Sequence, residues 1–92
     1  MLQASLIVVG GEATDHEIRL ELPATIGRGR EASVLVQHSL VSRLHCELFE
    51  RDGRLFVRDL QSLNGTYVNN FRIAEEEPLL PDQLLTLGNI TF

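Results

Sequence analysis

Four side chains of this 92-residue sequence could together bind a phosphate group and the peptide that carries it. Arg28 follows a glycine at the end of an apolar run, and its planar guanidinium stays charged at physiological pH. Ser42 has a hydroxyl that can donate to a phosphate oxygen, and Arg43 adds a second positive charge. Asn64 offers both donors and an acceptor to the main chain of an extended peptide. Each residue also has a structural alternative. Arg28 would be solvated and Arg43 would form an ion pair with a nearby acidic side chain. Ser42 and Asn64 would be ordinary turn residues, with the serine bonded to its own backbone.

Catalysis by the same region is a second hypothesis. Ser42 and His45 could act as nucleophile and base, and Cys46 is another candidate nucleophile. Residues three apart on a strand point to opposite faces, so Ser42 and His45 are poorly placed as a pair. Adjacent residues do so too, which separates His45 from Cys46. Cys46 also falls on the apolar face of its run, where a thiol is inert. His16, His38 and His45 lack metal-ligand spacing, so we expect neither an enzyme nor a metal or cofactor.

The elements that must position these residues are short strands. Apolar and polar residues alternate in three runs, and an apolar run near the N-terminus indicates a buried strand; the runs are 16–22, 44–49, 55–60 and 6–9. The alternation places Leu44, Cys46 and Leu48 on one buried face. No stretch has helical periodicity, so the sequence predicts an all-β sandwich or barrel.

Turn residues separate these runs at short intervals. Asp52-Gly53 is a strong hairpin signal, and Asn69-Asn70 is a weaker one because asparagine tolerates positive φ less freely than glycine. Gly10-Gly11 and Gly88-Asn89 indicate further turns. The three glutamates that precede Pro78 predict an exposed acidic loop.

Size and charge limit the classes of function. A chain of 92 residues suits one domain with little room for a deep catalytic cavity. Its net charge of −5 argues against general affinity for nucleic acid or an anionic membrane, although a few arginines can still form a local basic patch. A single cysteine fits a reducing compartment, and no apolar run is long enough to span a membrane or to form a secretory signal, so we expect a cytoplasmic protein.

Four motifs occur in order: Ile26-Gly27-Arg28, Ser42-Arg43-Leu44-His45, the run 59–66, and Val68-Asn69. Each motif is weak alone, but in this order and within an all-β pattern the sequence resembles the forkhead-associated (FHA) domain over residues 5–92. The resemblance implies a β-sandwich of two twisted, mostly antiparallel sheets with about eleven short strands. It also implies that loops at one end bind a phosphothreonine peptide.

The resemblance further implies a role for each matching residue. The binding residues would be Arg28, Ser42, Arg43, Leu63 and Asn64. The loop scaffold would be Gly27, His45, Gly65 and Asn69, with His45 supporting the loops through hydrogen bonds. Leu63 departs from the family, which often has threonine there, so only its backbone amide could reach phosphate. One lost hydrogen bond to a charged group costs about 1.5–3 kcal/mol.

Two function hypotheses follow from the resemblance. The first is a module that binds threonine-phosphorylated proteins for signalling-dependent assembly, with Arg30 either steering the anionic ligand or remaining solvated. The second is a phosphorylation-independent interaction or oligomerisation domain whose pocket has degenerated at Leu63. In both cases we expect residues 1–92 to form a single FHA-like domain within a longer protein. We expect this domain to bind neither nucleic acid nor a membrane, and its oligomeric state stays open.

Overall fold

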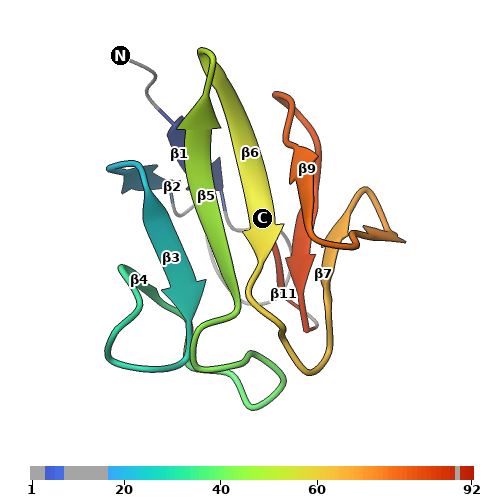
Figure 1. Ribbon diagram of the computed structural model, residues 1–92. Helices are drawn as coiled ribbons and strands as arrows, with labels where there is room; N and C mark the ends of the chain where they lie inside the picture. The colour runs from blue at the N-terminus through green and yellow to red at the C-terminus, as the bar shows by residue number, and fades with distance from the viewer. Residues whose placement is uncertain (1–3, 8–16, 89) are drawn as a thin grey trace.

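The computed structural model describes residues 4–7, 17–88 and 90–92, which form eleven strands (Figure 1). The strands are β1 (Ala4–Ile7), β2 (Glu17–Leu20), β3 (Ala24–Gly27), β4 (Val34–Leu35), β5 (Cys46–Arg51), β6 (Arg54–Asp59), β7 (Thr66–Val68), β8 (Phe71–Arg72), β9 (Glu76–Pro78), β10 (Leu85–Leu87) and β11 (Ile90–Thr91). The predicted turn at Gly10-Gly11, His16 and Asn89 lie outside the described residues. Within the described part, no helix is present that could cross a membrane.

The strands form a β-sandwich, which confirms the predicted fold class. One sheet has the order β4-β3-β5-β6-β9, the second has the order β11-β10-β7-β8, and β1 pairs with β2 in a separate ribbon. Only the β3–β4 pair is parallel among the described strand pairs. Both sheets contribute to one apolar core, which includes Ile26, Leu48, Val57, Val68, Leu85 and Leu87. Burial of this shared core holds the two sheets together.

Two of the predicted hairpins are confirmed with their register. Asp52 and Gly53 have φ values of 53° and 75°, and they join the paired residues Arg51 and Arg54. Positive φ at both central residues matches the right-handed twist of the strands on either side. Asn69 and Asn70 adopt the same conformation, with φ values of 49° and 71°, between β7 and β8.

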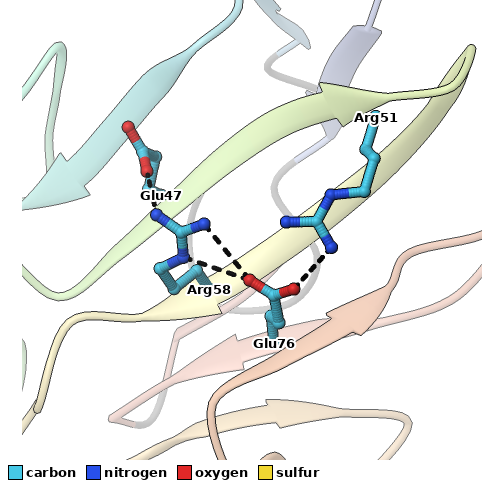
Figure 2. Close-up of polar contacts among 4 residues, drawn as sticks. All are labelled: Glu47, Arg51, Arg58 and Glu76. Atoms are coloured by element: carbon cyan, nitrogen blue, oxygen red, sulfur yellow. Dashed lines mark hydrogen bonds and ion pairs between the residues drawn. The ribbon is translucent and has the colours of Figure 1, made fainter.

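The predicted acidic loop is wrong, because the residues around Glu76 form the edge strand β9 on β6. Figure 2 shows Glu76 between Arg51 and Arg58, with N–O distances of 2.6 and 3.2 Å. The hydrogen bond from Arg51, with a further contribution from Arg58, lowers the pKa of the Glu76 carboxyl. Cross-strand ion pairs therefore make an acidic sequence compatible with an edge strand, and Pro78 is tolerated at such an edge.

The first strand of the long hairpin begins later than the alternation predicts. Cys46 and Leu48 are fully buried, but Leu44 is 41% exposed and precedes β5. His45 takes the buried position beside Cys46 instead, since its side chain finds hydrogen-bond partners inside the loops. The placement of Leu44 on the core face is therefore wrong. Figure 1 shows that the loops after β3, before β5 and after β6 gather at one end of the sandwich.

Candidate functional site

The loop that follows β3 lies along the loop that precedes β5. Arg28 N–H donates to Ser42 O and Gly29 N–H donates to Arg43 O, each at 2.9 Å. A Cβ atom on Gly27 would lie 2.0 Å from the Arg43 carbonyl oxygen, so a larger residue would force the two segments apart. These contacts extend the β3–β5 pairing into the loops and bring Arg28 beside Ser42 and Arg43.

The Arg28 side chain is tethered but exposed. Its Nε–H donates to Val41 O at 2.9 Å, next to Ser42 in sequence. Among the described residues neither terminal amino group of this guanidinium has a partner. The tether reduces the rotamer freedom that an external ligand would have to restrict, and it leaves the charged fork available for an anion.

The Ser42 hydroxyl accepts a hydrogen bond from Leu63 N–H at 3.1 Å. Its own proton is not used in that bond, so Ser42 can still donate to an anion. The Leu63 side chain is 85% exposed, whereas its amide, the group predicted to reach phosphate, already binds Ser42. Leu63 therefore orients the serine in this structure.

His45 is fully buried and joins two loops. Its Nδ1 accepts from Ser42 N–H at 3.0 Å, and its Nε2 lies 2.8 Å from Gly65 O. A backbone amide can only donate and a carbonyl can only accept, so the proton must be on Nε2. The ring bonds the Ser42 amide and not the hydroxyl, which leaves no nucleophile–base pair between these residues.

Asn64 and Gly65 lie on the loop between β6 and β7, which borders the site beside the loop of Ser42. Asn64 Nδ2 donates to Leu40 O at 2.8 Å, which links this loop to the loop that carries Ser42. One amide hydrogen remains, and Oδ1 accepts no hydrogen bond within the described part of the chain. Gly65 has φ of 87°, a conformation that L-residues rarely adopt.

Asp59 and Thr66, which the sequence suggests as scaffold residues, belong to a partly buried hydrogen-bond network that holds Asn64 and Gly65 in place. Asp59 Oδ1 accepts from the hydroxyls of Ser62 and Thr66, and Ser62 Oγ accepts from Gly65 N–H at 3.0 Å. Ser62 is only 8% exposed. The Asp-x-x-Ser spacing was the available signal, because an aspartate commonly bonds polar groups a few residues later in a turn.

The remaining predicted residues lie at different distances from this centre. Arg43 stays largely exposed, 3.8 Å from Glu31, and such a surface pair contributes little stability. Arg30 is exposed on the loop of Arg28. Asn69 bonds the backbone of Leu84 through its N–H and its Oδ1, each at 2.8 Å, so it secures the turn of the β7–β8 hairpin.

The structure gives little support to catalytic use of the region. Burial, followed by the nearby Asp59 carboxylate, raises the pKa of the Cys46 thiol, which disfavours the thiolate that a nucleophile needs. Within the ranges that the structure describes, no group of three or more histidine, cysteine or acidic residues could hold a metal ion. The arrangement of Arg28, Ser42 and Asn64 suits binding of an anion beside a polar main chain.

Comparison of the sequence with known proteins gives one consistent result. The FHA domain model matches residues 24–88. The chain is 38% identical over 74 residues to the ABC transporter ATP-binding/permease protein Rv1747 of Mycobacterium tuberculosis, covering 76% of this chain and 8% of that protein. It is 40% identical over 65 residues to the oxoglutarate dehydrogenase inhibitor of Corynebacterium diphtheriae, covering 70% and 46%. The chain thus spans less than half of either relative.

Solved structures share the fold. The FHA domain of the CT664 protein from Chlamydia trachomatis superposes with a TM-score of 0.88 at 23% identity, covering 98% of this chain and 93% of that chain. The FHA domain of FhaA superposes with a TM-score of 0.79 at 31% identity, covering 95% of this chain and 93% of that chain. That domain was solved in complex with the intracellular domain of Rv3910.

Proposed function

The chain belongs to the forkhead-associated (FHA) domain family, and from that premise we propose that it binds phosphothreonine in partner proteins. One observation carries the proposal: the Arg28 guanidinium is tethered to the carbonyl of Val41, the residue before Ser42, and both its terminal amino groups are free of partners in the described structure. Together with the Ser42 hydroxyl, they offer charged and neutral donors to phosphate oxygens. Arg43 lies on the same loop and adds positive charge.

Asn64 supports recognition of the peptide rather than the phosphate. Its remaining amide hydrogen and its Oδ1 can pair with the main chain of an extended segment. Gly27, His45 and Gly65 act indirectly, because they hold the loops of Arg28, Ser42 and Asn64 at fixed separation. We assign the Leu63 amide to orientation of Ser42, and we place Asn69 in the scaffold of the neighbouring hairpin.

The domain also has a proposed context, which is a longer protein in the cytoplasm. We propose that residues 1–92 act as one binding domain, without catalytic activity, within a longer protein. The larger size of the relatives supports this view. A cytoplasmic location fits a free buried cysteine and a ligand that ATP-dependent kinases produce.

The decisive experiment begins with an oriented library of phosphothreonine peptides, screened on immobilised protein. The selected peptide is then titrated by calorimetry in phosphothreonine, phosphoserine and unmodified forms. Loss of the phosphate should weaken binding by at least about tenfold, because each hydrogen bond to a charged group contributes about 1.5–3 kcal/mol. The methyl group of threonine should favour phosphothreonine over phosphoserine by about fourfold if it is buried. Equal binding of the unmodified peptide would refute the proposal and would favour a phosphorylation-independent interaction domain.

A further inference from the structure

Arg72 lies at the edge of the candidate site, although its strand β8 belongs to a different sheet from β3, which Arg28 follows. It occupies β8 and pairs with Tyr67 across the β7–β8 hairpin. A Cβ atom on Gly65 would lie 2.7 Å from Nε and 3.0 Å from Cζ of Arg72. The guanidinium therefore rests on the backbone of Gly65, one residue beyond Asn64.

The charge of Arg72 is not neutralised by the part of the chain that the structure describes. Its side chain is exposed, and within that part it makes neither a hydrogen bond nor an ion pair. By contrast, Arg51 and Arg58 share Glu76, and Arg43 lies 3.8 Å from Glu31. Arg72 is thus an arginine held in position by packing, with its hydrogen-bonding groups available to an external partner.

Glycine at position 65 makes this position possible. Gly65 O also accepts from His45 Nε2, so the peptide plane beneath Arg72 is fixed by a fully buried ring. The neighbouring Asn64 is held as well, because its Nδ2 donates to Leu40 O on the loop that carries Ser42. An extended peptide that contacts Asn64 with its main chain would place a flanking side chain near Arg72.

On the basis of the proposed function, we infer that Arg72 is a specificity residue that binds an anionic side chain flanking the phosphothreonine on the Asn64 side. The anion is either the carboxylate of an aspartate or glutamate or the phosphate of a second phosphorylated residue. A guanidinium binds both through the same paired N–H groups. The overall charge of −5 disfavours acidic peptides, so such a preference has to arise from a local contact.

The test uses a phosphothreonine peptide with alanine at all flanking positions. Two further series carry a single aspartate or a single phosphoserine at each flanking position in turn. Affinities are measured for the wild type, Arg72→Ala and Arg54→Ala. Arg54 is the matched control, because it is an exposed arginine at the turn end of the β5–β6 hairpin, opposite to the loops.

The wild type should prefer an anion at one flanking position by about two- to fivefold over alanine, the range of a partly exposed ion pair. Arg72→Ala should abolish this preference and bind the all-alanine phosphopeptide like the wild type. Arg54→Ala should retain the preference. The series that shows the larger Arg72-dependent gain identifies the source of the anion, and added salt should reduce that gain.

Three results would overturn the inference while leaving the proposed function intact. A uniform loss of affinity for all peptides in Arg72→Ala would mean that the side chain only supports Gly65. A preference that survives Arg72→Ala would place the contact elsewhere, and absence of any preference in the wild type would leave Arg72 without this role. If the wild type bound the all-alanine phosphopeptide no better than its unphosphorylated form, the proposed function itself would fail and the inference with it.

Discussion

Replacement of Arg28 is the most direct test of how this domain would bind phosphate. Arg28→Ala removes the exposed guanidinium and its tether from Nε to Val41 O. Arg28→Lys keeps the positive charge but loses the tether and the planar fork. Neither change touches the backbone hydrogen bond from Arg28 N–H to Ser42 O, so the loops should keep their course.

The expected magnitudes follow from the bonds that each variant loses. A hydrogen bond to a charged group contributes about 1.5–3 kcal/mol, so Arg28→Ala should bind the phosphothreonine peptide about 10- to 150-fold more weakly. The affinity of Arg28→Lys for the same peptide should lie between those of Arg28→Ala and the wild type. Stability should decrease by only about 0.5–1.5 kcal/mol, because one hydrogen bond at a partly exposed position is lost.

The assay is calorimetric titration with the selected phosphothreonine peptide, accompanied by urea unfolding of each variant. Arg54→Ala serves as the control for loss of one positive charge, since Arg54 lies at the far end of the β5–β6 hairpin. A folded Arg28→Ala protein with unchanged affinity would remove Arg28 from the site. An equal loss in Arg54→Ala would attribute the effect to overall charge and would refute the assignment of a direct contact.

Three further predictions concern the scaffold. His45→Ala should lower the free energy of unfolding by about 2–5 kcal/mol in urea, because the Ser42 amide and the Gly65 carbonyl lose their partner; a change below about 1 kcal/mol would contradict the bridge. Gly65→Ala should cost about 1–3 kcal/mol through its positive φ, and Arg72→Ala in the same chain should recover part of this loss if the new methyl group presses on the guanidinium. Glu76→Gln should destabilise the domain at neutral pH. Since the native pKa of Glu76 is lowered, its stabilisation is complete above the ordinary carboxyl pKa of about 4.3 and is lost as the pH falls through the lowered value. The melting temperatures of wild type and variant should therefore converge on acidification, and a constant gap would refute the ion-pair explanation.

Local signals accounted for the elements that depend on local geometry. The hairpin at Asp52-Gly53 was predictable because two residues with positive φ fix both the turn and the register of β5 against β6. The order of motifs led to Arg28, Ser42 and Asn64, whose loops are joined by hydrogen bonds in the structure. The hairpin is encoded within a few neighbouring residues, whereas the site residues became predictable only from the order of four short motifs along residues 26–69.

Features that depend on contacts between distant segments were not predictable in the same way. Glu76 looked like part of a solvated loop because its partners Arg51 and Arg58 lie at least eighteen positions away, on other strands. The bond from Asn64 to Leu40 O and the contact of Arg72 with Gly65 have the same origin in tertiary packing. An alternating pattern could not reveal that His45, and not Leu44, is the buried side chain, because the deciding interactions are hydrogen bonds to other loops.

The His45 bridge has a consequence for the dynamics of the domain. It connects the segment before β5, in one sheet, to Gly65, which precedes β7 in the other, so the ring fastens the two sheets at the end where the ligand would bind. Most ligand-binding loops open locally at little cost in free energy. Here the Ser42 amide is bonded to a fully buried ring that Gly65 O holds from its other side. Its amide proton should therefore exchange with solvent more slowly than those of loop amides that face water, which would make it a reporter of opening at this end of the sandwich.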